Sequence, residues 1–505
     1  MNKLASYLQK RFHSYGDSIA IKYKDSTLCY NQLDIISSEL SNLLKDKKIS
    51  SNIAIYGKKD IFKYISVVSI IYANKTYVPL NEKNIVSKNS TIIKNSDINT
   101  IITTKDSVEF IKKSFTNISN IITIDDKFDF QHIKLNLQSK DYSYSDLGYI
   151  LFTSGSTGEP KGVKVSKDNI LAYIKTKLDI YKFSLGLNFS QTAQLSFDIS
   201  TFETFISLSS GGILHLISDE DILCPSDYIM ENNINVWYSV PTFAINMDKL
   251  GVYEENCFPS LKYSFFCGEP MPKDIAIKWL SSATNSILDN LYGPTEATVD
   301  VTRYSFTKDN FHQKFYNDIL PIGKPIDNQD VIIVDNDNNI ITKINEVGEI
   351  LISGTQLSQG YLNNEIKNQE HFIEYSYNDK IKRFYRTGDL AFYNENMDLE
   401  FHSRKDTQIK IGGKRVEIGE IEYIFKSNNL LKNIIIVPKK DTNGRVMELV
   451  AFIVENLDQD GIKVVQKKAM GLLDRLFIPK KFIYIEDYPK TISNKIDRKF
   501  LENSI

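Results

Sequence analysis

The sequence predicts an α/β protein in which a large N-terminal domain is followed by a small α+β C-terminal domain. Apolar runs alternate with polar, helix-like stretches early in the chain, at 66–73, 99–104 and 120–125, as is typical of α/β folds. Between 331 and 361 the apolar runs are separated by Asp-Asn and Gly turns, a pattern that favours antiparallel hairpins. The chain of 505 residues also exceeds what a single ordinary core accommodates.

The expected elements follow the chain in order. Each of the three early runs is interpreted as a buried strand or as the core of a helix, and with their neighbours they form two α/β subdomains. The segment 331–361 closes the large domain as a β-barrel-like subdomain. Beyond it we expect a helix at 417–426, strands at 433–438 and 449–455, a second helix, and a last strand near 482–486.

A polar, charge-dense junction lies at 403–410. Because linkers between domains are polar and make few contacts, we place the domain boundary there. The prediction is an N-terminal core of residues 1–404 and a C-terminal domain of residues 405–505, with a hinge near Asp406.

Bulk composition argues against several classes of protein. A formal net charge of -2 gives no general attraction to nucleic acid or to an anionic membrane. The N-terminus lacks an apolar signal region, and no stretch offers the ~20 apolar residues of a membrane span. The four cysteines are scattered without CxxC spacing, which argues against zinc or a disulfide framework. We therefore expect a cytoplasmic protein, with a monomer as the default.

The run at 148–166 is the most informative part of the sequence. An apolar strand enters a loop of small hydroxyl and Gly residues that is followed by a lysine. Glycines allow close backbone approach to phosphates, while hydroxyls and the lysine supply donors and charge. The spacing is not that of a Walker A loop. The predicted triphosphate-binding residues are Thr153, Ser154, Gly155, Ser156, Thr157, Gly158 and Lys161.

At these residues the sequence resembles the adenylate-forming superfamily of acyl-CoA synthetases, luciferases and peptide-synthetase adenylation domains. The resemblance covers essentially the whole chain, because five further motifs follow in the order of the family. They are YGPTEAT at 292–298, GEI and GYL at 348–350 and 360–362, YRTGDL at 385–390, SRKDTQIKIGGKRVEIGEIE at 403–422, and NKIDRK at 494–499.

The resemblance implies ATP and Mg²⁺ as cofactors. Glu296 would help to hold Mg²⁺ near the phosphates, which suits the preference of this ion for hard oxygen ligands. Thr295 would contact the α-phosphate, and Tyr292 would stack on adenine with Asn290 at the base edge. Gly293 completes this turn of the nucleotide site.

The resemblance also implies a ribose site and a catalytic lysine. Asp389 would accept hydrogen bonds from the ribose hydroxyls, and Arg404 would reinforce that grip from the domain junction. Lys495 would bridge the substrate carboxylate and the α-phosphate, acting with Glu296 and Thr153 as the catalytic group.

Two motif positions depart from the family. Ser403 replaces the usual Gly before Arg404, and Asn494 replaces the usual Gly before Lys495. Asn is well tolerated at positive φ, so the turn that presents the lysine is expected to survive.

Members of the family use one site for two half-reactions by rotating the small domain about the hinge. The C-terminal domain is therefore expected to be mobile, and rotation would remove Lys495 from the site. The face that carries Gly413 would then line a tunnel for the phosphopantetheine arm of a carrier protein. Lys410 resembles a second motif lysine. No carrier domain follows Lys495, so the partner is expected to be a separate chain.

Asp198 points to an amino acid as the substrate. It matches the aspartate that binds the α-ammonium group in amino-acid-activating members, whereas acyl-CoA and aryl-acid ligases of the superfamily, the alternative reading, usually lack it. The aromatic rings among the remaining family pocket positions are bulky, which implies a shallow pocket. They are Ile199, Phe202, Tyr238, Phe265, Cys267, Leu291, Val299 and Asp300.

The chain looks closest to stand-alone D-alanine:carrier protein ligases, which also keep a pocket cysteine like Cys267. Those ligases, however, carry small apolar residues where this chain has Asp300. A pocket carboxylate calls for a hydroxyl or amine donor, and Leu291 with Asp300 and a small residue at 267 resembles the pocket of serine-activating adenylation domains. Serine or a similar small polar amino acid therefore ranks level with D-alanine. Wall-polymer D-alanylation and natural-product loading both fit.

Overall fold

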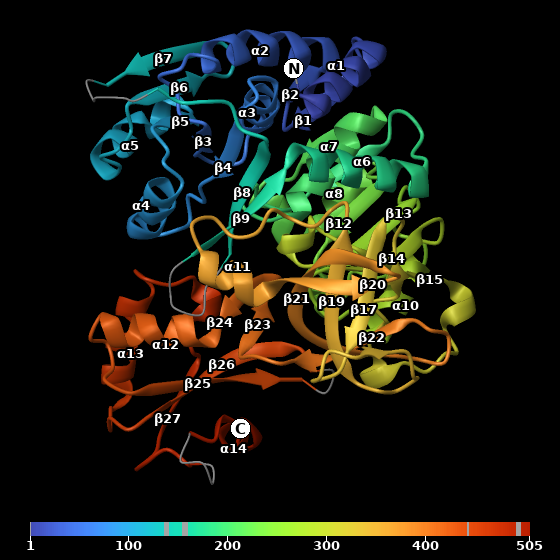
Figure 1. The fold of residues 1–505 in the computed structure, drawn as a ribbon, viewed down its shortest axis with the longest axis vertical. Coiled ribbons are helices and arrows are strands. Elements are labelled where there is room, and N and C mark those ends of the chain that lie inside the picture. Colours follow the sequence, from blue (N-terminus) through green and yellow to red (C-terminus); the bar gives the residue numbers. More distant parts are fainter. Residues whose placement is uncertain (1, 136–140, 154–159, 442–443, 491–495) are drawn as a thin grey trace.

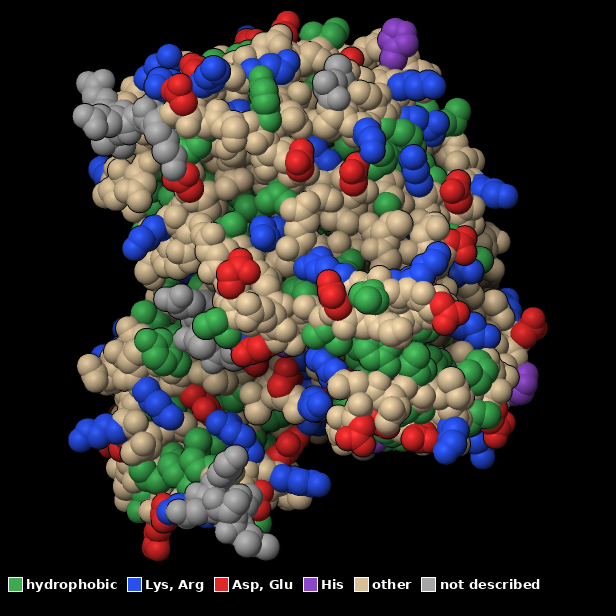
Figure 2. All heavy atoms as spheres, viewed as in Figure 1, with side chains coloured by type: hydrophobic (Ala, Val, Ile, Leu, Met, Phe, Trp, Pro, Cys, Tyr) green, Lys and Arg blue, Asp and Glu red, His purple; other side chains and the backbone are tan. Residues whose placement is uncertain are grey.

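The computed structural model describes residues 2–135, 141–153, 160–441, 444–490 and 496–505. Three sheets form the large N-terminal part, and two small sheets form the C-terminal domain at one end of the molecule (Figure 1). This arrangement confirms the predicted α/β fold class. Within the described ranges no helix is long and apolar enough to cross a membrane. Figure 2 shows Lys and Arg side chains interspersed with Asp and Glu over the face in view.

The first subdomain is a seven-stranded sheet whose inner strands are parallel. In sheet order its strands are β7 (Phe130–Lys134), β6 (Asn120–Ile124), β5 (Thr100–Thr103), β3 (Asn52–Ile55), β4 (Thr76–Pro79), β8 (Leu147–Thr153) and β9 (Lys161–Ser166). Its helices are α1 (Lys3–Tyr15), α2 (Tyr30–Leu44), α3 (Ile61–Tyr72), α4 (Val86–Asn95) and α5 (Val108–Ser114).

The early apolar runs resolve into both kinds of element. Those at 99–104 and 120–125 are the strands β5 and β6, whereas the run at 66–73 forms most of helix α3. Every residue of α3 is buried, and a helix buried on all sides shows no amphipathic period. Periodicity alone therefore does not distinguish it from a strand.

The second subdomain is a nine-stranded sheet with a parallel centre. In sheet order its strands are β16 (Lys324–Pro325), β15 (Thr302–Phe306), β14 (Ile287–Tyr292), β13 (Tyr263–Cys267), β12 (Val236–Ser239), β10 (Asn188–Gln191), β11 (Ile213–Leu216), β1 (Ile19–Tyr23) and β2 (Ser26–Cys29). Its helices are α6 (Lys167–Tyr181), α7 (Ile199–Ser210), α8 (Pro225–Glu231), α9 (Pro241–Lys249) and α10 (Lys273–Ser282).

The third subdomain is antiparallel, as the turn-rich segment predicted. Its strands are β18 (Ile340–Ile341), β17 (Gln329–Val334), β19 (Gly348–Gly354), β21 (Lys380–Tyr393), β20 (Phe372–Tyr377) and β22 (Leu399–Arg404), with α11 (Glu365–His371) before β20. The pairing path runs from β18 to β20, with β22 added on β21, so this sheet is open rather than a closed barrel.

The C-terminal domain begins with a hairpin of β23 (Gln408–Ile411) and β24 (Lys414–Glu417). Its second sheet contains β25 (Ile434–Lys440), β26 (Val446–Ile453) and β27 (Lys481–Tyr484), and its helices are α12 (Ile418–Ser427), α13 (Gln459–Ala469) and α14 (Arg498–Asn503). The elements follow the predicted order, with bounds that differ by a few residues.

Candidate active site

The candidate site lies where the central strands of the nine-stranded sheet end. β12, β13 and β14 are parallel, so their carboxyl ends meet at one edge of the sheet, the edge at which α/β proteins bind ligands. Tyr238 is in register with Phe265, and Cys267 with Leu291. The sheet therefore brings together side chains that the sequence placed in one pocket.

Asp198 lies at the entrance of this pocket, directly before α7. The hydroxyl of Thr295 donates a hydrogen bond of 2.6 Å to its Oδ2 atom. Burial raises the pKa of Asp198, while the Thr295 hydrogen bond and the charge of Lys410 on β23 act to lower it. A half-buried carboxylate whose pKa is raised in this way is stabilised when a cation binds to it.

Three aromatic rings form the pocket wall. Phe202 lies 4.8 Å from Tyr238 and 5.3 Å from Phe265, measured between ring centroids, and all three contacts are edge-to-face. These rings are at most 1% exposed. The other predicted wall positions, Ile199, Cys267, Leu291, Val299 and Asp300, are buried as well.

The structure corrects the reasoning about Asp300. The sequence argument treated it as a carboxylate that awaits a donor from the substrate, but the chain supplies the donors itself. Lys177 forms an ion pair with Oδ1, and the hydroxyls of Tyr173 and Tyr238 donate to Oδ2 at 2.8 and 3.2 Å. The pairing of Asp300 thus removes one of the two reasons for ranking serine level with D-alanine, and the resemblance at positions 267, 291 and 300 is unaffected.

The nucleotide side of the site is built on β14 and β21. The hydroxyl of Tyr292 donates to Asp389 Oδ2 at 2.6 Å, and Arg404 pairs with Asp389 Oδ1 at 2.7 Å. The side-chain N–H groups of Asn290 donate hydrogen bonds to the carbonyls of Leu320 and Pro321. The amide oxygen of Asn290 is therefore the atom that would accept a hydrogen bond from a base. The predicted adenine and ribose residues are thus neighbours in the fold.

Gly293 lies where two backbone segments approach closely. A Cβ atom at this position would lie 2.5 Å from the Asp300 Cα and 2.6 Å from the Val299 carbonyl oxygen. Only glycine fits without moving the backbone that carries the pocket wall.

Glu296 is fully buried and ionised. Arg415, on β24, lies 3.0 Å from its Oε2 atom, and the Tyr361 hydroxyl donates to Oε1 at 2.7 Å. Burial alone would raise the pKa of Glu296, but the Arg415 charge and the Tyr361 hydrogen bond outweigh it and lower this pKa to about 2. Arg415 belongs to the motif at 403–422, and the sequence alone predicted no role for it.

Glu296 fits the predicted magnesium role, because an ionised carboxylate is the ligand that Mg²⁺ prefers. In this structure the cation beside it is the guanidinium of Arg415. Among the described residues no group of three His, Cys, Asp or Glu side chains is arranged to hold a metal. The remaining ligands of such an ion would have to come from phosphates and water.

The strand ends that flank the phosphate loop are in place. Thr153 ends β8, Lys161 begins β9, and the two residues are paired in register. The Lys161 ammonium lies 5.8 Å from the centre of the Tyr361 ring, and burial together with the charge of Arg415 lowers the pKa of this lysine. Ser154, Gly155, Ser156, Thr157, Gly158 and Lys495 lie outside the described residues, so their roles remain predictions.

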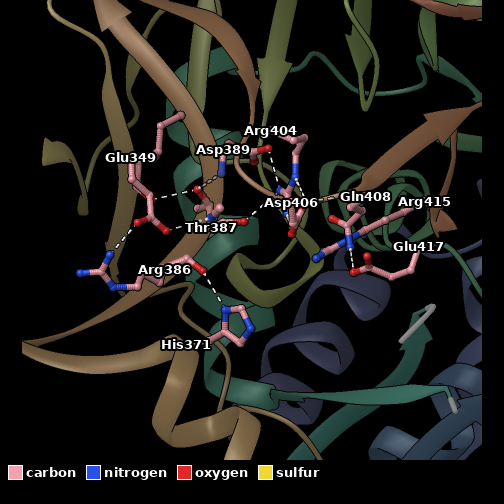
Figure 3. A network of polar contacts seen from close by, with 12 residues as sticks. Glu349, His371, Arg386, Thr387, Asp389, Arg404, Asp406, Gln408, Arg415 and Glu417 are labelled. Atoms are coloured by element: carbon pink, nitrogen blue, oxygen red, sulfur yellow. Dashed lines mark hydrogen bonds and ion pairs between the residues drawn. The ribbon is translucent and has the colours of Figure 1, made fainter. Parts of the chain in front are cut away.

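The domain junction is held by a polar network (Figure 3). Arg404 contacts Asp406 through two hydrogen bonds, of 2.9 and 2.6 Å, in addition to its ion pair with Asp389. The backbone N–H of Gly413 donates to Glu269 Oε1 at 2.6 Å. Hairpin β23–β24 therefore reaches from the C-terminal domain into the site, and Asp406 lies at its base.

Comparisons with known proteins agree with this geometry. A model of the AMP-binding enzyme family matches residues 8–362, and the chain belongs to this family. The predicted superfamily is thereby confirmed, as is the enzyme class, a ligase of the adenylate-forming kind.

Relatives match along the whole chain. Zwittermicin A synthase ZmaJ of Bacillus cereus is 30% identical over 515 residues, which cover 99% of this chain and 95% of that protein. A D-alanine–D-alanyl carrier protein ligase of Bacillus licheniformis is 30% identical over 522 residues, which cover 100% of this chain and 99% of that protein. The Vibrio cholerae adenylation domain AlmE, solved in complex with glycyl-adenosine-5'-phosphate, has a TM-score of 0.87 at 25% identity and covers 100% of this chain and 98% of its own.

Proposed function

We propose that this protein activates a small amino acid as its AMP ester and transfers it to the phosphopantetheine thiol of a separate carrier protein. The observation that carries this proposal is Asp198. Its carboxylate is half-buried beside Thr295 of the nucleotide site, directly before the helix that carries Ile199 and Phe202 of the predicted pocket. An α-ammonium group bound there would hold the substrate carboxylate near the α-phosphate.

The size of the pocket supports a small substrate. Phe202, Tyr238 and Phe265 enclose it, and none of the three is more than 1% exposed. The names of the relatives point the same way, since they refer to D-alanine and to a glycyl adenylate.

We assign the nucleotide as ATP and the metal as Mg²⁺. Asn290 and Tyr292 would hold the base, Asp389 the ribose, and Thr295, Lys161 and the 153–158 loop the phosphates. Glu296 would hold the magnesium ion, which would neutralise phosphate charge during adenylation. Because Glu296 lies beside Arg415, we infer that the guanidinium and the magnesium ion bind this carboxylate at different stages of the reaction.

The hairpin of the C-terminal domain supports the transfer half-reaction. Gly413 lies against Glu269 and Val240 of the large domain, and only a glycine allows the hairpin to approach them this closely. We propose that the acceptor is a separate carrier protein and that the enzyme acts as a cytoplasmic monomer. Lys495 would act in the first half-reaction, adenylation, when the C-terminal domain is in its other orientation.

Amino-acid-dependent pyrophosphate exchange tests the proposal. The wild-type protein should exchange with small amino acids and not with benzoate or fatty acids, because only an ammonium group satisfies Asp198. Lys495→Ala should lower exchange by roughly 100-fold or more while transfer of a preformed adenylate persists. Exchange with benzoate or a fatty acid, and none with amino acids, would identify an aryl-acid or acyl-CoA ligase instead.

A further inference from the structure

A buried ion pair lies at the end of the substrate pocket. Neither side chain of the Lys177–Asp300 pair is exposed to solvent. Lys177 comes from the middle of α6, and its ammonium lies 5.5 and 5.9 Å from the ring centres of Tyr173 and Tyr181. These three residues are spaced four apart, so they share one face of the helix.

The cage around Lys177 is itself anchored. The Tyr181 hydroxyl donates to Asp289 Oδ2 at 2.7 Å, and Ser305 donates to Asp289 Oδ1 at 2.6 Å. Arg303 lies 3.6 Å from the same carboxylate. The Tyr181 ring that lies beside the Lys177 ammonium is therefore held in place by a second set of polar contacts.

Cys267, the last residue of β13, lies close enough to Asp300 and to Asp198 for both carboxylates to act on its thiol. Burial raises the pKa of the Cys267 thiol to about 12, and the charges of Asp300 and Asp198 both act in the same direction. The negative charges of both carboxylates therefore act on this one thiol. A substrate bound through Asp198 would direct its side chain toward Cys267 and Tyr238, with Asp300 beyond them.

The pairing changes what Asp300 is able to recognise. Its charge is neutralised by Lys177, and both of its oxygens already accept hydrogen bonds. A substrate hydroxyl or ammonium that sought Asp300 would have to displace one of these donors and leave it buried without a partner, which is costly. The pocket therefore ends in a closed, internally satisfied wall.

We propose that Lys177 is a specificity-determining positioning residue: by holding Asp300, it restricts the substrate side chain to a hydrogen atom or a methyl group. This inference rests on the proposed amino-acid activation. It excludes the longer polar substrates that an unpaired Asp300 would attract, among them serine and 2,3-diaminopropionate.

The wild-type protein gives the first test. Pyrophosphate exchange should show kcat/KM for glycine or one alanine enantiomer roughly 100-fold above that for either serine enantiomer or 2,3-diaminopropionate. A preference for serine would overturn the inference, because it would mean that Asp300 accepts a bond from the substrate. Exchange with no amino acid at all would instead refute the proposed function on which the inference rests.

Variants give the second test, with opposite charges left in the pocket. Lys177→Met leaves the Asp300 carboxylate without its partner and should raise kcat/KM for 2,3-diaminopropionate about tenfold or more. Asp300→Asn leaves the Lys177 ammonium without its partner and should raise kcat/KM for aspartate by a similar factor. The double variant should gain neither. If the pair has only a structural role, each single variant should lower kcat/KM for all substrates together. No gain that depends on the remaining charge should then appear.

Controls separate specificity from folding. Lys175 is exposed on the same helix, so Lys175→Met should keep the wild-type substrate profile. Single variants leave one buried charge and are expected to melt at lower temperature than the double variant. If a single variant does not fold, the wild-type profile decides the inference, and absence of a charge-dependent gain in folded variants contradicts it.

Discussion

The carboxylates of Asp300, which is buried, and of Asp198, which is half-buried, have different counter-ions. Asp300 is neutralised by Lys177 from within the large domain. Asp198 accepts a hydrogen bond from the neutral Thr295 hydroxyl, and the cation acting on it, Lys410, comes from the other domain. When the C-terminal hairpin withdraws, Asp198 would keep only the neutral donor. This difference favours Asp198, rather than Asp300, as the carboxylate that would bind the ammonium group of the proposed substrate.

The raised pKa of Asp198 predicts an acid-dependent loss of substrate binding. The bound ammonium requires the carboxylate form, and a raised pKa means that protonation begins at a higher pH than for an ordinary aspartate. The KM for the amino acid should therefore rise as the pH falls through that pKa. Steady-state pyrophosphate exchange at a series of pH values measures this effect.

Asp198→Asn should raise the KM for the amino acid roughly 100-fold and abolish its acid dependence, while the KM for ATP changes little. Asp179→Asn, at an exposed position of α6, serves as the matched control. An unchanged pH profile in Asp198→Asn would assign the acid dependence to another group.

Hairpin β23–β24 is the element that delivers cations to the site. Its turn is Gly412–Gly413 with positive φ at both positions, the geometry of a tight two-residue hairpin. Lys410 and Arg415 are directly opposite in register, so their side chains leave the same face. One acts on Asp198 and the other contacts Glu296.

Gly413→Ala is expected to slow transfer to the carrier while exchange persists. A Cβ atom at this position would lie 2.6 Å from Val240 Cγ1, so the hairpin would be displaced from the large domain. Gly412→Ala is the control, because it carries a similar positive φ but contacts Leu476 of the C-terminal domain instead. Single-turnover transfer from a preformed adenylate compares the two variants, and equal losses would attribute the effect to backbone strain.

At the scale of the whole molecule, the structure holds one of the two orientations that the proposed reaction requires. The Arg415–Glu296 ion pair and the Gly413–Glu269 hydrogen bond join the C-terminal domain to the large domain. Both contacts use the hairpin face expected to line the carrier tunnel. Adenylation would require Arg415 to leave Glu296, so that the carboxylate becomes available to magnesium.

Arg415→Ala and Lys495→Ala should therefore affect opposite half-reactions. Loss of Arg415 removes a buried charge pair between domains and should slow transfer by roughly 30-fold or more, with exchange preserved. Lys414→Ala is the control on the same strand, since Lys414 pairs with Asp474 inside the C-terminal domain. If Arg415→Ala impairs exchange as strongly as transfer, the ion pair is not specific to the transfer orientation.

The sequence by itself determined the family, the order of the elements and the residue types at the chemical positions. Asp198, Glu296 and Asp389 were predicted as site residues from their motifs, because each proposed role depends on the type of residue at one position. The helix α3 was ambiguous because a fully buried helix lacks an amphipathic pattern.

Only the tertiary structure decided which charges meet. Lys177 and Asp300 are 123 positions apart, and Arg415 and Glu296 are 119 apart. The spacing of Tyr173, Lys177 and Tyr181 signals a shared helix face, yet it does not say which carboxylate that face meets. Packing of separate elements sets these distances, and burial then makes each pairing strong. For that reason the motifs predicted the chemistry, whereas the fold decided that Asp300 is paired with Lys177 and that Arg415 is paired with Glu296.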